Sequence, residues 1–339
     1  MSSNHRMAYF IYAAGIAAQG STSFTRVRGL QSIGVTTRFN LEHVFEIGQI
    51  DEYQAVENVP DVEVTAEKVL DGAELIWHLA TQGATSPTLA GRSSQKCQLA
   101  VSYFTDTQNS ASGTPLAQAS MSGLFASSLT YSFPVGGNFT ESVTFVGNNK
   151  TISTSSFSFT GGFLNTDTPP SGVQRRQHMR FGSGAGYCVL PTNLPGVTNF
   201  GGSGYNLQDP STGDFGAHIQ SIRTSVNLGR TPLYELGRKI PYFRTVDFPV
   251  EVRTDFEFYC QTGDNLQALE TADNVTTTPI WLRIDDQTIF DLGTRNKLIS
   301  STEQGGNAQV GGGNRTISFS YVNYNNLTVT NPHSDPSGL

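Results

Sequence analysis

Residues 30–81 read LQSIGVTTRFNLEHVFEIGQIDEYQAVENVPDVEVTAEKVLDGAELIWHLAT, and this pattern occurs a second time further along the chain. Leu30-Gln-Ser-Ile33 is matched by Ile219-Gln-Ser-Ile222, and Phe45-Glu-Ile-Gly48 by Tyr234-Glu-Leu-Gly237, at one offset (219 − 30 = 189; 234 − 45 = 189). Tyr53 and Pro60 fall on Tyr242 and Pro249 at the same offset. After the proline one residue is lost, so that Val62-Glu-Val64 is predicted to match Val250-Glu-Val252. A fixed period of this kind indicates a tandem duplication.

A second match follows the first in the same order along the chain. It aligns Gly136-Gly-Asn138, Thr140, Val143 and Phe145 with Gly312-Gly-Asn314, Thr316, Phe319 and Tyr321 (312 − 136 = 176). The chain of 339 residues is long enough for two units that each bury a core. We therefore predict two domains, 1–165 and 166–339, the second opening with a long Gly/Pro-rich loop or arm.

The composition favours an all-β protein. Charged residues make up only 14% of the chain and aromatic residues 10%, with 35 glycines, a balance that suits short strands and turns. The net charge of −7 argues against binding nucleic acid through a basic surface, because neutralising phosphates requires clustered Lys and Arg. An acidic surface would instead let DNA pass without adhering.

Local patterns predict strands and two short helices. Ile33 and Val35 alternate with polar residues, and after a turn at 58–61 the apolar face resumes at 62–66. Asp71 is predicted to cap a short helix at 75–79, and Asp264 a second one at 265–271. Further strands are expected at 45–50, 97–105, 124–133, 139–146, 152–159, 250–258, 280–292, 316–322 and 327–330. Loops are expected at 105–120 and 160–217, and a tip or hairpin turn at 304–314.

The apolar run 8–18 follows Arg6, as the hydrophobic region of a signal peptide would. We interpret it instead as a strand or as an arm docked in an assembly. No apolar run approaches the length of a membrane span. Cys97, Cys188 and Cys260 lie far apart, which argues against a disulfide framework or a zinc site.

The candidate catalytic groups do not form a recognisable motif. Asp51-Glu52 and Asp285-Asp286 are carboxylate pairs, but acidic residues at strand positions usually form a solvated face. The six histidines are scattered without the spacing of metal ligands, and His78 is expected to be a hydrogen-bonded boundary residue of the first helix. Gly182-Ser-Gly-Ala-Gly186 lacks the GK[ST] ending of a phosphate loop. We predict no enzyme activity, no cofactor and no metal site.

The two copies differ in charge. Between Glu42 and Glu74 there are ten carboxylates and one lysine, Lys68, whereas residues 223–264 carry six Arg or Lys and six carboxylates. If the copies alternate around a ring, an acidic face would repeatedly meet a locally basic one, which would help to set the register. Drift of exposed residues after duplication explains the difference equally well.

Several motifs of both copies occur together in one known family. They are residues 33–81 with Phe45-Glu-Ile-Gly48, Val59-Pro-Asp-Val-Glu-Val64 and Lys68-Val-Leu-Asp-Gly72, then residues 139–147 and 189–195, Tyr234-Glu-Leu-Gly-Arg238 and Phe248-Pro-Val-Glu-Val252. On these residues, which span most of the chain, the sequence resembles the tail tube proteins of tailed bacteriophages. The resemblance implies two β-sandwich or barrel domains, each with one short flanking helix, that assemble into stacked rings.

The resemblance also implies a function and partners. Six such units form a ring, so a duplicated chain implies trimers with pseudo-sixfold symmetry, or hexamers as the alternative. The partners would be further copies of the chain, other tail proteins, possibly a sheath, and DNA passing through the lumen without sequence-specific binding. The protein would be assembled in the host cytoplasm and reside in the phage tail of the virion. We expect hairpins at 38–60 and 228–249 to line the lumen or join the rings; their candidate residues are Glu46, Asp51, Glu52, Tyr53, Glu235, Arg238, Lys239 and Tyr242.

Two other classes of function remain open. A carbohydrate-binding β-sandwich of a tail fibre or adhesin would use Tyr53 and Tyr242 as stacking platforms. Their equivalent positions in the two copies favour a structural role instead. A glycoside-cleaving enzyme would need one carboxylate pair whose single mutations abolish turnover.

Overall fold

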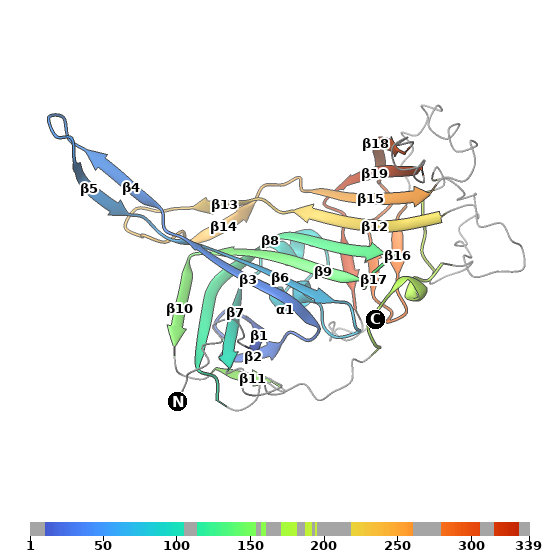
Figure 1. Cartoon of the computed structure of the whole chain (residues 1–339), viewed down its shortest axis with the longest axis horizontal. Coiled ribbons are helices and arrows are strands. Elements are labelled where there is room, and N and C mark those ends of the chain that lie inside the picture. The colour runs from blue at the N-terminus through green and yellow to red at the C-terminus, as the bar shows by residue number, and fades with distance from the viewer. Residues whose placement is uncertain are drawn as a thin grey trace, which may run out of the picture.

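One long antiparallel sheet organises the computed structural model, which describes residues 11–104, 114–153, 157–160, 171–181, 187–191, 194, 218–259, 279–305 and 315–331. The sheet crosses the upper part of Figure 1 and lies over smaller layers of strands and helices. Its strand order is β3 (Leu30–Arg38), β6 (Asp61–Val69), β9 (Thr140–Gly147), β8 (Ala117–Pro134), β12 (His218–Asn227), β15 (Glu251–Tyr259), β19 (Thr316–Tyr324) and β18 (Lys297–Gln304). Every neighbouring pair is antiparallel. The all-β fold class predicted from composition is confirmed, since the described residues form large antiparallel sheets and only short helices.

The eighteen residues of β8 serve two sheets at once. The C-terminal half of β8 pairs with β9 and β12, and the N-terminal half pairs with β7 (Cys97–Phe104) and β10 (Asn149–Ser153). The second sheet continues from β7 through β1 (Ile11–Ala18) and β2 (Ser23–Arg26) to β11 (Ser158–Thr160). Residues 11–18 of the early apolar run therefore form a strand, as expected.

Smaller elements complete the layer beneath the long sheet (Figure 1). A three-stranded sheet consists of β16 (Trp281–Arg283), β17 (Ile289–Asp291) and β20 (Thr328–Thr330). The helices are short: α1 (Ile76–Ala80), α2 (Leu89–Ser93) and the 3-10 turn η1 (Arg176–His178). α1 packs against β1, β8 and β9, so it lies on the sheet as predicted.

Two hairpins extend from the same end of the long sheet. β4 (Leu41–Phe45) and β5 (Glu52–Glu57) continue β3 and β6, while β13 (Arg230–Leu233) and β14 (Phe243–Val246) continue β12 and β15. Figure 1 shows the β4–β5 hairpin reaching furthest from the body. Both copies of the repeat thus contain the hairpin predicted within 38–60 and 228–249.

The core lies between the long sheet and the layer beneath it. Val62, Val64 and Ala66 of β6 are each at most 1% exposed, and Phe256 and Phe258 of β15 are fully buried, which confirms the alternation predicted for both strands. Fully burying one large apolar side chain stabilises a protein by about 1.5–3 kcal/mol. One cluster of buried residues runs through both copies, from β6 to β19.

The strand order shows the duplication directly. The series β3-β6-β9-β8 is followed by β12-β15-β19-β18, so each copy contributes four strands and the copies join at β8 and β12. The β-bulge at Gln31 in β3 returns at Gln220 in β12, 189 positions later (220 − 31 = 189). A second bulge at Ser127 in β8 returns at Ile299 in β18 (299 − 127 = 172). Because bulges are specific local features, their recurrence supports a common origin of the two units.

The strand registers refine the alignment of the two copies. Val143 pairs with Ala66 and Phe319 with Phe256, which confirms the predicted offset of 176 between β9 and β19. The predicted match of Val62 with Val250 is wrong. Val62 pairs with Thr37 and Val252 with Val226, so Val62 corresponds to Val252 (226 − 37 = 189; 252 − 62 = 190). The second copy has gained one residue after the proline rather than lost one.

Several local predictions need correction. Residues 46–51 form the turn of the β4–β5 hairpin and not a strand, because Phe45 ends β4. Asp71 does not cap α1, whose N-cap residue is Leu75. The Asp71 carboxylate instead accepts a hydrogen bond from the backbone N–H of Ala73 in the loop before the helix. Residues 117–120, expected in a loop, begin β8, and the expected strand at 152–159 is divided between β10 and β11. β18 was not predicted at all.

Other predictions lie outside the described residues. These are the helix at 265–271 with its cap Asp264, the tip within 306–314, the domain boundary between 165 and 166, and most of the loop-rich stretch 160–217.

Candidate assembly interface

The long sheet ends in two open edges. In the described part of the chain, β3 pairs only with β6, and β18 pairs only with β19. Seven of the eight residues of β18 are exposed, and the nine residues of β3 are half-buried or exposed. An open edge of this length presents a row of unpaired backbone N–H and C=O groups that another strand can bind.

The two copies join inside the chain where β8 pairs with β12, and this internal seam shows what such an edge pairs with. β8 and β12 pair in antiparallel register, with Leu129 opposite Val226 and Tyr131 opposite Thr224. β3 is the counterpart of β12, and β18 is the counterpart of β8. The two free edges therefore correspond to the two strands that pair with each other within the chain.

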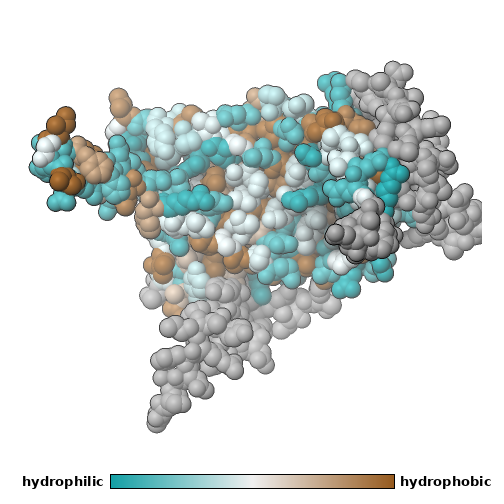
Figure 2. Space-filling model, turned by 45° about the horizontal axis from the view of Figure 1, so that its top comes forward, coloured by the Kyte–Doolittle hydropathy of each residue, from teal (hydrophilic) through white to brown (hydrophobic). Residues whose placement is uncertain are grey.

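The face of the long sheet that points away from the core is polar. Hydroxyl side chains line it, including Thr65 and Thr144, whose oxygens are 3.4 Å apart. Two of its arginines are neutralised, because Arg38 lies 3.3 Å from Glu63 and Arg253 lies 2.9 Å from Asp255. Figure 2, in which the top of the sheet is turned forward, shows hydrophilic and near-neutral residues over this region.

The candidate residues of the first hairpin gather at its end. Glu46 and Asp51 lie in the turn of the β4–β5 hairpin, and Glu52 and Tyr53 begin β5. All four are exposed, Tyr53 by 61%. The Glu52 carboxylate is 2.6 Å from Nδ1 of His43.

The candidate residues of the second hairpin gather in the same way at the β13–β14 turn. Glu235, Arg238 and Lys239 lie in this turn and Tyr242 precedes β14; all four are exposed. Arg238 binds Glu235 at 2.9 Å. The structure thus places four candidates on each hairpin, and Tyr53 and Tyr242 lie on separate tips.

Apolar side chains are also exposed on both hairpins. Figure 2 shows hydrophobic residues at the projecting end of the molecule. On the β4–β5 hairpin the exposed apolar residues are Phe39, Leu41, Val44, Phe45, Ile47, Ile50 and Val56, and on the β13–β14 hairpin they are Leu236 and Ile240. A cluster of exposed apolar side chains of this kind is typical of a surface that binds a partner.

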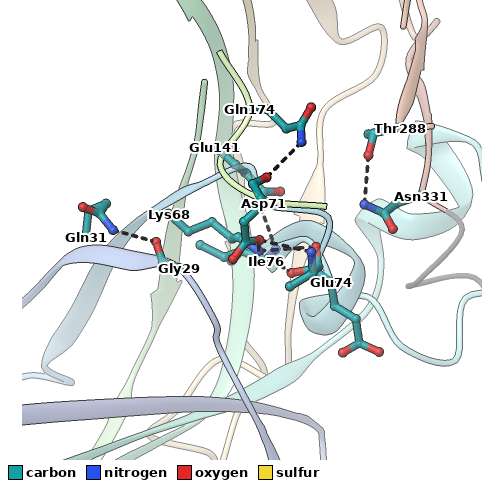
Figure 3. A network of polar contacts seen from close by, with 12 residues as sticks. Gly29, Gln31, Lys68, Asp71, Glu74, Ile76, Glu141, Gln174, Thr288 and Asn331 are labelled. Atoms are coloured by element: carbon teal, nitrogen blue, oxygen red, sulfur yellow. Dashed lines mark hydrogen bonds and ion pairs between the residues drawn. The ribbon is translucent and has the colours of Figure 1, made fainter. Parts of the chain in front are cut away.

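A buried polar network holds α1 under the long sheet, and Figure 3 shows five of its members from close by: Lys68, Asp71, Glu74, Ile76 and Glu141. The Glu141 carboxylate of β9 accepts hydrogen bonds from the backbone N–H groups of Ile76 (2.6 Å) and Trp77 (3.0 Å) and from the Tyr131 hydroxyl (3.1 Å). Burial raises the pKa of Glu141, an effect that the nearby Lys68 ammonium opposes. Burial, together with the Glu141 charge, raises the pKa of Tyr131.

Lys68 makes the same network continuous with the loop before α1. Its ammonium is fully buried and donates to Asp71 Oδ1 (3.3 Å) and to the carbonyl of Glu74 (2.8 Å). Because a buried charge is tolerated only when it is paired and hydrogen-bonded, these contacts indicate a structural role. In the second copy Phe258 takes the place of Lys68 and Ile317 the place of Glu141, so the network belongs to the first copy alone.

Other residues singled out in the sequence have structural partners. The Nε2 atom of His78 lies 2.8 Å from the carbonyl of Val329, as expected for a hydrogen-bonded residue, although His78 is buried rather than at the boundary. Asp285 pairs with Arg180 at 2.6 Å, and Asp286 accepts from the Thr288 N–H. Within the described ranges no His, Cys, Asp and Glu side chains group as metal ligands would.

The β13–β14 hairpin is anchored by residues that the sequence analysis did not single out. Arg230 donates from Nη2 to the Ser93 carbonyl (2.6 Å) and from Nε to the Ala126 carbonyl (2.7 Å). Arg244 is 8% exposed and donates to Asp61 and Asn148. The first copy has Leu41 and Ala55 at the positions of Arg230 and Arg244. This difference between the copies was the sequence signal that could have drawn attention to the two arginines.

Comparison with known proteins identifies no family for this chain. No protein-family model matches it, and no curated protein sequence matches it. One solved structure that matches is a chain of the "Cryo-EM structure of the anti-feeding prophage (AFP) baseplate, 6-fold symmetrised", at 8% identity and a TM-score of 0.32, over 45% of this chain and 97% of that chain. A similarity at this level carries no argument about fold or function. No helix among the residues described here is long and apolar enough to cross a membrane.

Proposed function

We propose that this protein is a structural ring-forming component of a phage-like tail, a subunit of the tube that conducts DNA, and that it has no enzymatic activity. The observation that carries the proposal is the relation between the free edges and the internal seam. β3 and β18 are the counterparts of two strands that already pair inside the chain. Repeating that pairing between chains would continue the sheet from one molecule to the next.

A repeated seam leads to a ring rather than to a dimer. Pairing β18 of one chain with β3 of the next is a head-to-tail contact, and head-to-tail contacts close into rings when the rotation per unit allows it. With two similar units in each chain, three chains would give a ring with pseudo-sixfold symmetry, and six chains would give a twelve-unit ring. Closing the sheet into a barrel would also remove both exposed edges.

The polar face of the sheet suits the lining of such a ring. Its hydroxyl groups offer few cationic anchors to a polyanion, and salt bridges neutralise Arg38 and Arg253. Glu67, Glu251 and Glu257 remain as acidic groups against Arg223 and Lys297. DNA would therefore slide past this face instead of binding, because binding requires neutralisation of phosphates by clustered cations.

The equivalence of the edges specifies the register of the proposed seam. Tyr131 lies opposite Thr224 inside the chain, and their counterparts are Glu303 of β18 and Val35 of β3 (303 − 131 = 172; 224 − 35 = 189). A Val35→Cys chain mixed with a Glu303→Cys chain should form a disulfide-linked dimer under mild oxidation. Each single variant alone, and a Val35→Cys chain mixed with an Arg176→Cys chain, should not.

Electron microscopy of the purified protein supplies the second test. The proposal expects annuli with pseudo-sixfold symmetry that stack into tubes, and mass photometry should give three chains per ring, or six for the alternative. Protein that stays monomeric at high concentration and gives no Val35–Glu303 crosslink would overturn the proposal.

A further inference from the structure

The β13–β14 hairpin of the second unit docks on the first unit of the same chain. The Arg230 guanidinium lies 5.1 Å from the centre of the Phe125 ring while it donates to carbonyls of the first unit. The rings of Phe243 and Phe125 meet edge to face at 5.2 Å. Arg244 adds an ion pair to Asp61 at 2.9 Å. The hairpin is thus fastened to the unit that precedes its own unit in the sheet.

The β4–β5 hairpin of the first unit has no such receiving surface within the described chain. Every residue of β4 and β5 is exposed. Where this hairpin leaves the sheet, the Asn40 side-chain amide donates hydrogen bonds to the Val59 carbonyl and to the Asp61 carboxylate. These contacts lie within the first unit. Leu41 and Val44 are 51% and 38% exposed, although they match Arg230 and Leu233 of the docked hairpin.

The registers of the two hairpins make them equivalent residue by residue. Leu41 pairs with Glu57 and Arg230 with Val246, both at the offset of 189 (230 − 41 = 189; 246 − 57 = 189). The same offset places Gln54 at Phe243. On the receiving side, the alignment of β8 with β18 places Lys297 at Phe125 (297 − 125 = 172). The alignment of β9 with β19 makes Tyr324 the counterpart of Asn148 (324 − 148 = 176).

From this equivalence we propose that the β4–β5 hairpin docks on the second unit of a neighbouring copy of the chain. Its receiving surface lies around Lys297, Leu298 and Tyr324, at the start of β18 and the end of β19. The inference rests on the proposed ring, because the neighbour whose β18 pairs with β3 is the one that presents this surface to the hairpin.

Charge complementarity supports a second copy as the partner. Residues 39–60 contain five carboxylates and no Lys or Arg. The proposed receiving surface presents two exposed cations, Arg295 and Lys297. The Arg244–Asp61 ion pair of the internal contact has the opposite polarity, because there the hairpin supplies the cation. The first unit also contributes Lys96 to that contact, 5.4 Å from the centre of the Phe243 ring.

Apolar side chains complement the charges at this contact. Tyr324 and Ile299 of the receiving surface are 56% and 55% exposed, and the β4–β5 hairpin exposes Leu41 and Val56. Covering them would remove from water the kind of apolar surface that single chains seldom expose in clusters. The Arg244–Asp61 ion pair has no counterpart, because Ala55 takes the place of Arg244.

The ring would have two kinds of joint, β8 with β12 inside a chain and β18 with β3 between chains. The different charges of the two hairpins would make these joints distinct. An acidic hairpin fits the surface with Arg295 and Lys297, whereas the basic β13–β14 hairpin would be repelled by it. Unlike charges promote one pairing and like charges suppress the other. The alternation of first and second units already follows from their covalent linkage, so the hairpin charges would act by favouring the joint between β18 of one chain and β3 of the next.

Cysteine crosslinking between two chains tests the contact. A Gln54→Cys chain mixed with a Lys297→Cys chain should be joined into a dimer by a short bismaleimide, since the ring centres of the counterparts Phe243 and Phe125 are 5.2 Å apart. The matched control replaces the second chain by Arg176→Cys, whose exposed residue lies on η1. The Val35→Cys and Glu303→Cys mixture is run beside it to report the seam. A seam crosslink without a hairpin crosslink would overturn this inference and leave the ring standing, and the loss of both would overturn both.

A charge swap tests the chemistry of the same contact. Glu57 lies directly across from Leu41 and so on the face that is expected to meet Lys297. Lys297→Glu should weaken assembly about threefold at each joint, the size typical of one exposed ion pair. Adding Glu57→Lys should restore assembly, whereas Arg176→Glu should leave it unchanged. Equal assembly of the Lys297→Glu and Arg176→Glu variants would contradict the proposed contact.

Discussion

Replacing Glu141 by alanine should selectively destabilise the first unit. The carboxylate is fully buried and accepts from Ile76, Trp77 and Tyr131, so its removal leaves three donors in the core without an acceptor. It also removes the negative charge that faces buried Lys68. Breaking a buried charge network costs about 3–5 kcal/mol, and each stranded donor about 1–3 kcal/mol, so we expect a loss of about 3–5 kcal/mol after relaxation.

Trp77 reports this loss locally. The chain has two tryptophans, Trp77 and Trp281, so a Trp281→Phe background leaves the fluorescence of α1 as the only indole signal. Urea titration at low protein concentration then measures the unfolding free energy of the first unit in the Glu141→Ala variant and its parent. Glu141→Gln is the matched control, because its amide oxygen keeps part of the hydrogen bonding and should lose about half as much.

The pH dependence provides an independent check on the same residue. Because burial raises the pKa of Glu141 in the folded state, the folded chain binds a proton that the unfolded chain has already released. Stability should therefore fall as pH rises from the unfolded pKa near 4.5 through the folded pKa, by at most about 1.4 kcal/mol per pH unit. The Glu141→Gln variant should lack this slope. A loss below about 1 kcal/mol in Glu141→Ala, or equal losses in the two variants, would refute the reasoning.

Two further predictions concern the docked hairpin and the cysteines. Arg244→Ala removes hydrogen bonds to Asp61 and Asn148, which should weaken docking of the hairpin by about 1–3 kcal/mol. Trypsin should therefore cleave the β13–β14 turn faster. An unchanged cleavage rate, or an equal increase in Arg176→Ala, would contradict this prediction. Burial raises the pKa of both Cys97 and Cys188 to about 12, so neither thiol should be alkylated by iodoacetamide at pH 8 in the folded chain, and both should be alkylated in urea. Mass spectrometry of tryptic peptides checks this, and rapid native labelling of either residue would show that it is not buried.

The strands that alternate clearly were predictable because their signal is local. Val62, Val64 and Ala66 lie on one side of a strand whatever it pairs with, since successive side chains point to opposite faces. β18 was missed because seven of its eight residues are exposed, so Ser300, Ser301 and Thr302 show no apolar alternation. Its position in the sheet comes from backbone pairing with β19, which leaves no mark on residue type.

The candidate interface was predicted in part for the same reason. Both hairpins could be located from the repeat, and all eight candidate residues lie on them. The repeat distinguishes Arg230 and Arg244 as residues that the first copy lacks, but it could not predict their partners Ser93, Ala126 and Asp61, which lie more than a hundred positions away in the chain.

The sequence by itself determined that one unit occurs twice, that each copy is β-rich and carries a hairpin, and that the first hairpin is acidic. These properties follow from periodicity, turn residues and charge, which act between near neighbours in the chain. Only the tertiary structure decided that the copies share a single sheet through β8 and β12, and that this sheet leaves β3 and β18 free. The physical reason is that edges join through backbone hydrogen bonds, which every residue except proline can both donate and accept.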